Sequence, residues 1–295
     1  MVLALSVLEI VAPVFLLASI GYTWVKCGAE YRVQFVTQMA MTLSIPCLVF
    51  VSLMQTKIPP ELLVEISLAT ITAYLLVGVT GWLALKIFGL KQRTFLPPVL
   101  FGNTGNVGLP LAFFAFGDIG LGYAIVVFAI MAIFSFTFGV WLVAGGGGIA
   151  KTLREPLVPA TILGGIFMLM DWQTPVFLTN TLSLIGQMGI PLMLITLGVA
   201  VGQLKPLRVP QAVAISIGKL VLCTAAAWLA GRYFGLEPVA FAILVLQITT
   251  PVAVTSYMLA EKYGADGASV AGLVVVSTLI CVLSLPVLLV ILLQN

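Results

Sequence analysis

The stretch FGNTGNVGLP, residues 101–110, decides how the chain folds, because it places three glycines, two asparagines, a threonine and a proline inside an apolar segment. Lipid offers no water to backbone groups that a helix leaves unpaired. Pro110 has no backbone N–H, and the glycines at 102, 105 and 108 make unwinding less costly. The sequence therefore predicts that a membrane helix is interrupted between Gly102 and Pro110.

The composition requires a bilayer around the rest of the chain. Of 295 residues, 61% are hydrophobic and 8% are charged, and the mean hydropathy is +1.22. A water-soluble globule has too little interior to bury so many apolar side chains. Long apolar runs without strand-like alternation exclude a β-barrel. We expect an all-α integral membrane protein.

The chain lacks the residues of most enzyme sites. Histidine is absent, and the four cysteines are scattered without the spacing of a metal site or a disulfide framework. The sequence therefore predicts no metal ion, no cofactor and no enzymatic activity.

Charges and turn residues divide the chain into about ten spans of membrane length. Residues 1–22 belong to the first span and are not a signal peptide, because no basic residue precedes the apolar run. The predicted spans are 4–25, 33–54, 62–87, 95–116, 120–144, 156–171, 176–201, 210–232, 238–260 and 267–292.

The distribution of Lys and Arg predicts the orientation, because these residues stay on the cytoplasmic side. Joints after the odd-numbered spans hold most of the basic residues, whereas the opposite joints hold only Lys57 and Arg232. We expect a plasma membrane or bacterial inner-membrane protein with both termini on the non-cytoplasmic side.

The two halves of the chain resemble each other in their prolines. Pro13, Pro46 and Pro110 correspond to Pro159, Pro191 and Pro251, at separations between 141 and 146 residues. Five spans in each half make the second copy enter the membrane from the other side, as in secondary transporters. The sequence thus predicts two inverted five-helix repeats, residues 1–146 and 147–295, joined near the GGGG of 145–148.

A second interruption is predicted in the ninth span, at LQITTPVAVTS, residues 246–256. Each interruption leaves free N–H groups at the start of its second half, where the helix dipole favours an anion. The candidate substrate-binding residues of the two interruptions are Asn103, Thr104, Gly105, Asn106, Gln247, Thr249 and Thr250, and the helices are expected to cross at Pro110 and Pro251. The alternative is a proline kink with glycines that allow close helix packing.

Two charged residues inside the first and eighth spans are candidates for an electrostatic or coupling role. Lys219 lies near the middle of the eighth span, where a charge is costly unless it is paired or hydrated. It either offsets substrate charge, holds the carbonyls of the unwound segments, or extends to the interface. Glu9 lies near the outer end of the first span and is the weaker candidate.

The motif GNTGNVGLPLAFFAFG at 102–117 resembles the signature of the auxin efflux carrier family, which includes plant PIN proteins and bacterial permeases. Residues 246–286 are similar to the C-terminal block of that family. The resemblance implies crossing fourth and ninth helices, a scaffold domain of spans 1, 2, 6 and 7 that often forms a homodimer, and a mobile transport domain of spans 3–5 and 8–10. It also implies that Asn103 and Asn106 lie at the crossing point. The long cytoplasmic loop of the plant proteins is missing here.

These observations favour a secondary transporter that moves a small organic anion, an auxin-like monocarboxylate or a dicarboxylate, by alternating access of the elevator type. A sodium-coupled, bile-acid-like symporter of similar architecture is the closest alternative. An anion channel is less well supported, because the sequence shows no ring of charges or repeated filter.

Overall fold

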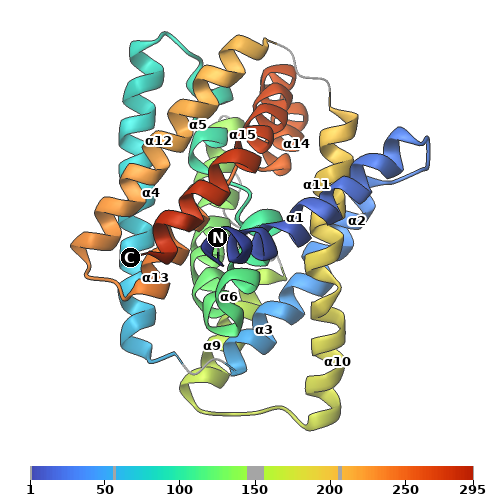
Figure 1. Cartoon of the computed structure of the whole chain (residues 1–295), viewed down its shortest axis with the longest axis vertical. Helices are drawn as coiled ribbons and strands as arrows, with labels where there is room; N and C mark the ends of the chain where they lie inside the picture. Colours follow the sequence, from blue (N-terminus) through green and yellow to red (C-terminus); the bar gives the residue numbers. More distant parts are fainter. Residues whose placement is uncertain (1, 56–57, 145–155, 205–207, 295) are drawn as a thin grey trace.

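The computed structural model describes residues 2–55, 58–144, 156–204 and 208–294 (Figure 1). These residues form helices and an isolated β-bridge, with no β-strand among them. The elements are α1 (Val2–Lys26), α2 (Val33–Met39), η1 (Ala40–Ser44), α3 (Ile45–Gln55), α4 (Pro60–Ile87), α5 (Gln92–Leu100), η2 (Thr104–Gly108), α6 (Leu109–Phe134), η3 (Ser135–Gly139), α7 (Val140–Ala144), α9 (Leu157–Leu169), α10 (Val176–Gln187), α11 (Gly189–Gln203), α12 (Val209–Tyr233), α13 (Pro238–Ile248), α14 (Val254–Lys262) and α15 (Gly267–Leu293).

Six helical stretches in the described part of the chain are long and apolar enough to cross a bilayer: 33–55, 61–87, 104–144, 176–203, 209–233 and 267–293. This confirms an all-helical integral membrane protein. The bounds of α1, α4, α12 and α15 agree with the spans predicted at those positions to within a few residues. The number of crossings and the inverted repeat stay predictions. The predicted joint at 145–148 lies outside the described residues, as does Lys57.

Three of the predicted spans, the fourth, the fifth and the ninth, are not single uninterrupted helices. The predicted fourth span is divided between α5 and the start of α6, and the predicted ninth span between α13 and α14. The fourth and fifth spans are continuous in α6 except at Gly117, whose φ of 61° and ψ of −149° break the helical geometry. Glycine adopts such a positive φ at little cost, so the chain turns there, at the expected joint between the two spans.

The helices pack in two groups. On one side, α1 packs along α11, and α3 packs against α9 and α10. On the other side α4 packs along α12, and α12 also contacts α13 and α15 (Figure 1). Helix α6 lies between the two groups, because it packs against α1 and α3 as well as against α4. Side chains such as Val79, Val221 and Leu283 are exposed in the middle of long helices, as expected where lipid surrounds the protein.

The contact between α1 and α11 depends on two glycines. A Cβ atom built on Gly198 would lie 1.7 Å from the carbonyl oxygen of Ala18, and one built on Gly21 would lie 2.0 Å from that of Ile195. In lipid, helices associate by close van der Waals packing because the hydrophobic effect does not distinguish a neighbouring helix from acyl chains. The two glycines therefore allow the backbones of α1 and α11 to touch.

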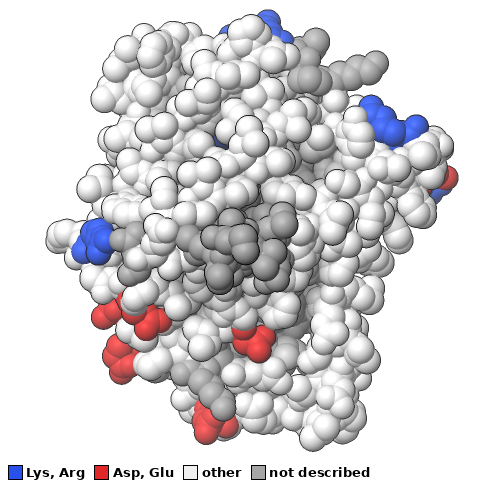
Figure 2. All heavy atoms as spheres, in the orientation of Figure 1, with Lys and Arg blue, Asp and Glu red and all other residues white. Residues whose placement is uncertain are grey.

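Charged side chains separate along the long axis. Most blue Lys and Arg atoms in Figure 2 lie towards the end at which α4 ends and α12 begins, and most red Asp and Glu atoms lie towards the opposite end. Lys26 and Lys86 are in the last turns of α1 and α4. Glu61 is in the first turn of α4, and Glu237 precedes α13. The protein thus has a basic end and an acidic end, with an apolar band between them.

At the basic end Asp266 fixes the start of α15. Its carboxylate accepts hydrogen bonds from the backbone N–H of Ser269 at 3.0 Å and from the Ser269 hydroxyl at 2.8 Å, and it lies 3.4 Å from the guanidinium of Arg208. The two bonds from Ser269, and then the charge of Arg208, lower the pKa of Asp266.

Replacement of Gly198 by alanine tests the packing of α1 on α11. Gly198→Ala is expected to lower the free energy of unfolding by about 1–3 kcal/mol, because the new methyl group meets backbone that does not yield. Thermal unfolding of the purified protein in detergent measures the change. Gly218→Ala on α12 is the control, because a Cβ there meets nothing within 4 Å and alanine favours the helix. Equal stability of the two variants would contradict the close contact.

Candidate functional site: the crossing of two interrupted helices

The two interruptions face each other and are joined through their backbones. Residues 101–103 separate α5 from η2, and residues 249–253 separate α13 from α14. Gly102 and Val252 form an antiparallel β-bridge, and the N–H of Asn103 donates a hydrogen bond of 2.7 Å to the carbonyl oxygen of Pro251. The unwound segments therefore satisfy part of each other's backbone, as unwound chain at membrane depth requires.

The position of the first interruption differs from the prediction, which extended it to Pro110. Leu109 has helical backbone angles, φ −60° and ψ −49°, and Pro110 lies in the first turn of α6. Pro110 closely follows η2, so a wider π-helical turn precedes the position at which proline removes a helical N–H. Pro251, in contrast, lies within the second interruption and accepts a bond from Asn103. The crossing is thus formed by residues 102–103 and 251–252, and Pro110 lies in the helical stretch that begins at Thr104.

Several buried polar atoms at the crossing have no hydrogen-bond partner. They are Nδ2 of Asn103, Oγ1 of Thr104, and both Oε1 and Nε2 of Gln247. Asn103 is 5% exposed, and Thr104 and Gln247 are fully buried. Each such atom costs about 1–3 kcal/mol unless water or a ligand pairs with it. The crossing therefore has free hydrogen-bond donors and acceptors that a polar ligand or water could pair with.

The remaining predicted residues have other local roles. The hydroxyls of Thr249 and Thr250 donate to the carbonyl oxygens of Val245 and Gln247, both at 2.7 Å, and so close the last turn of α13. The N–H of Asn106 donates to Oδ1 of Asn103 at 3.3 Å, so that Asn103 caps η2.

Gly105, also predicted, lies against the helices around the crossing and is not a polar group of the site. A Cβ there would lie 2.8 Å from Cε of Met193 on α11 and 3.2 Å from the ring of Phe128. Glycine at 105 allows η2 to approach α11.

One glycine within the first interruption and one in η2, which follows it, allow polar side chains of the second helix pair to come close. A Cβ on Gly102 would lie 2.2 Å from Oγ1 of Thr250, and a Cβ on Gly108 would lie 2.1 Å from Oε1 of Gln247. Larger residues would displace these groups. The glycines that weaken the helix thus also provide the space that Gln247 and Thr250 occupy.

Ser277 is a residue of the crossing that the sequence did not reveal. The N–H of Val252 donates to Oγ of Ser277 on α15 at 2.9 Å, and both groups are buried. The only sign of this role is a hydroxyl in a long apolar helix, and serine is common in such helices. Ser277 satisfies a backbone group that the interruption leaves free.

Lys219 is buried beside α5. It is 4% exposed, and its Nζ lies 3.6 Å from Sγ of Cys223, which in turn lies 3.8 Å from the carbonyl oxygen of Val99 in the last turn of α5. No carboxylate lies within ion-pair distance of it among the described residues, whose ion pairs are Arg32–Glu30 and Arg208–Asp266. Lys219 therefore does not extend to the interface, and its charge lies near the negative end of the α5 dipole. Glu9 belongs to α1, and its side chain lies outside the described part of the structure.

A polar cavity of about 520 Å³ opens at the acidic end. Its lining comes from α3, α4, α6 and the residue before α13, and includes Gln55, Asp118, Tyr123 and Glu237. The hydroxyl of Tyr123 donates to Oε1 of Glu237 at 2.6 Å, which ties the start of α13 to the middle of α6. The cavity lies between α3, from one group of helices, and the helices of the other group.

Comparison with known proteins indicates membrane transport. Residues 148–289 match the family model described as membrane transport protein. The matched residues, a little under half of the chain, are similar to this family of membrane transport proteins. The match supports a role in membrane transport, in agreement with the resemblance found in the sequence.

Two archaeal relatives extend the similarity over nearly the whole chain. An uncharacterized transporter of Methanothermobacter thermautotrophicus is 27% identical over 297 residues, which cover 94% of this chain and 96% of the relative. One of Methanocaldococcus jannaschii is 24% identical over 294 residues, which cover 92% and 94%. Both carry the name of a transporter without a substrate.

Ser277→Ala tests the support of the crossing. The change leaves the N–H of Val252 without an acceptor, so we expect the free energy of unfolding to fall by about 1–3 kcal/mol. Thr278→Val is the matched control, because its hydroxyl donates only to the carbonyl of Val274 in its own helix. Unfolding in detergent measures both variants, and the bond would be unimportant if the serine variant were as stable as the control.

Proposed function

We propose that this protein is a secondary transporter that binds a small organic anion at the crossing of its two interrupted helices. The observation that carries the proposal is the set of partnerless polar atoms on Asn103, Thr104 and Gln247, buried beside a backbone bridge at the centre of the bundle. A purely structural crossing has no use for four unpaired polar atoms, whereas a binding site exposes them in turn to its ligand.

The charge of the substrate follows from the helix ends. The helices that begin at Thr104 and Val254 start at the interruptions, and free N–H groups at a helix start favour an anion. Lys219 adds a positive charge close to the same region. We infer that a carboxylate is the group recognised, as in an auxin-like monocarboxylate or a dicarboxylate.

Alternating access of the elevator type fits the grouping of the helices. The proposed scaffold contains α1, α2, α3, α9, α10 and α11, and the proposed transport domain contains the other helices. Contacts of α1 with α11 and of α3 with α9 support this division. They also support the inverted repeat of residues 1–146 and 147–295. In this repeat α1 corresponds to α9 and α3 corresponds to α11, so a two-fold axis exchanges the α1–α11 pair with the α9–α3 pair. A homodimer through the scaffold remains part of the proposal.

The proposed orientation places the basic end in the cytoplasm and both termini outside it. The separation of Lys and Arg from Asp and Glu in Figure 2 supports this direction. The crossing then lies between the two ends, accessible in turn from each.

Asn103→Ala and Asn106→Ala test the site. Each is expected to lower the ratio kcat/KM for uptake into proteoliposomes about 10–100-fold, because a hydrogen bond to a charged ligand contributes about 1.5–3 kcal/mol. A thermal-shift screen of organic acids on the purified protein first identifies the acid to be labelled, since a ligand that binds the folded state raises its stability.

Asn180→Ala is the control for these two variants, because Asn180 is exposed on α10. Uptake at the wild-type rate in correctly folded Asn103→Ala protein would refute the proposed site. Uptake that requires sodium would favour the bile-acid-like symporter, and single-channel currents would favour an anion channel.

Lys219→Gln tests the role of the buried charge. Moving one elementary charge across the membrane changes its electrical free energy by about 2.3 kcal/mol per 100 mV of membrane potential. If the charge of Lys219 moves during transport, its removal is expected to change how the uptake rate depends on an imposed potassium-diffusion potential. Lys219→Arg keeps the charge and is expected to keep the dependence. An unchanged potential dependence in the glutamine variant would show that Lys219 is only structural.

A further inference from the structure

A second cavity lies on the membrane-facing side of the protein, separate from the polar cavity and open to the bilayer. It has a volume of about 530 Å³ and lies between α4, α5 and the segment from the end of α6 through η3. Of its ten lining residues, only Tyr74 and Trp82 carry a polar side-chain atom. Water and small ions find few partners there, so the cavity suits an apolar guest.

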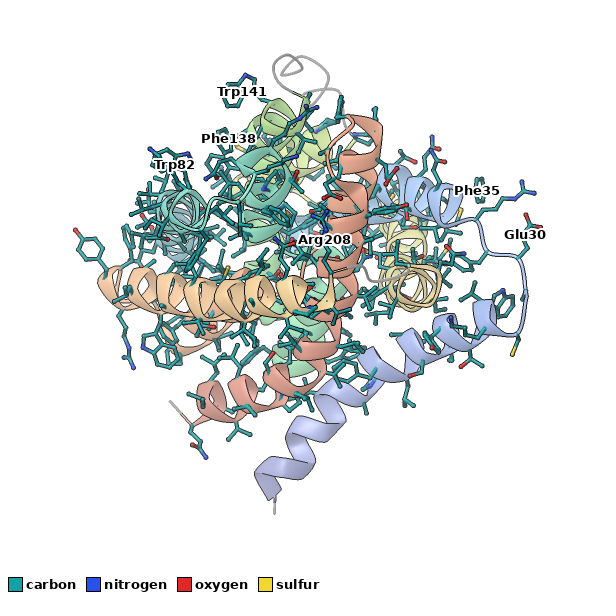
Figure 3. All side chains as sticks on the ribbon, turned by 90° about the horizontal axis from the view of Figure 1, so that it is seen from above. Glu30, Phe35, Trp82, Phe138, Trp141 and Arg208 are labelled. Atoms are coloured by element: carbon teal, nitrogen blue, oxygen red, sulfur yellow. The ribbon has the colours of Figure 1, made fainter. Side chains whose placement is uncertain are left out.

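The side chains at its mouth are those that meet lipid. Val79 is 66% exposed and Leu75 is 59% exposed, both on α4, and Phe138 of η3 is 42% exposed. In the view from above, Trp82, Phe138 and Trp141 lie along one side of the bundle (Figure 3). The molecules present at this opening are therefore the acyl chains of the surrounding bilayer.

The length of the cavity matches one leaflet. On α4 the lining extends from Tyr74 to Trp82, which corresponds to about 12 Å at 1.5 Å per residue. Half of the hydrocarbon core of a bilayer is about 15 Å thick. The Trp82 end lies near the basic end of the protein, at which α4 ends, so the cavity runs from that interface towards the middle of the membrane.

A cation marks the interfacial end. The Nζ of Lys86 lies over the ring of Trp82, 5.0 Å from its centroid, and the rings of Phe138 and Trp141 stack with centroids 5.8 Å apart. Tryptophan and lysine at this depth anchor a protein at the headgroup level. A lipid whose chain fills the cavity places its phosphate near Lys86, and an anionic headgroup complements that charge.

We propose that this cavity binds one phospholipid from the leaflet at the basic end, with an acyl chain between α4, α5 and η3 and an anionic headgroup at Lys86. The bound chain packs against Phe101, the first residue of the interruption after α5. The lipid thereby supports the wall of the crossing. The inference concerns a lipid and does not depend on what the protein transports.

Native mass spectrometry of the purified full-length protein, titrated with phosphatidylglycerol or phosphatidylcholine, tests the proposal. We expect one phosphatidylglycerol to be retained at least severalfold more tightly than phosphatidylcholine. Gly78→Leu fills the cavity, because a Cβ at Gly78 already lies 3.5 Å from Leu100, and it is expected to weaken binding of both lipids at least tenfold. Gly218→Leu, the same change on a lipid-facing part of α12, is expected to bind like the wild type.

A pair of lysines separates a headgroup site from general surface charge. Lys86→Gln is expected to remove the preference for phosphatidylglycerol, whereas Lys26→Gln is expected to keep it. Lys26 is the matched control, because it lies over the ring of Tyr22 at 5.4 Å in the last turn of α1, a helix that contributes no residue to this cavity. Equal losses in the two lysine variants, or wild-type binding by Gly78→Leu, would overturn the proposal.

A measurement with the cavity unaltered covers the case in which Gly78→Leu does not fold. Trp82 is kept, and the other four tryptophans, Trp24, Trp141, Trp172 and Trp228, are replaced by phenylalanine. Phosphatidylglycerol with bromine on its acyl chains is expected to quench the fluorescence of Trp82 at about one lipid per protein in detergent. Quenching that needs a large excess of lipid would overturn the proposal.

Discussion

The structure depends on one requirement, that two interrupted helices satisfy their backbone groups inside a membrane. The hydrogen bond from the N–H of Asn103 to the carbonyl of Pro251, the bridge between Gly102 and Val252, and the hydroxyl of Ser277 together supply partners that lipid does not. Neither interruption is stable in a bilayer without the other. The surrounding helices therefore have to hold the two segments face to face, and the packing of the bundle follows from this condition.

The same requirement creates the polar site. A continuous helix pairs its own backbone N–H and C=O groups, so it needs no polar side chains such as Asn103 or Gln247 in its middle. Once the helices are broken, small residues at 102 and 108 bring polar side chains of one segment against the backbone of the other, and some of their atoms remain unpaired. These atoms raise the free energy of the folded protein unless water or a ligand pairs with them.

The membrane-facing cavity and the polar crossing lie close together because α5, which lines the cavity and leads into the crossing, is short. α5 is only nine residues long, so Leu100 and Phe101, which line the membrane-facing cavity beside α4, directly precede the crossing residues Gly102 and Asn103. The buried charge of Lys219 lies at the same helix end, beside Cys223 and the carbonyl of Val99. The membrane-facing cavity, the charge of Lys219 and the crossing thus all adjoin the last turn of α5.

The sequence by itself determined the membrane location, the helical class, most helix bounds and the existence of two interruptions, because these follow from local properties: hydrophobicity over a span, and the backbone limits of glycine and proline. Only the tertiary structure decided where the segments meet. Proline marks both an interruption and the first turn of a helix, so Pro110 and Pro251 looked equivalent although only Pro251 lies in a break. The role of Ser277 and the burial of Lys219 arise from neighbours distant in the chain, on which local sequence carries no information.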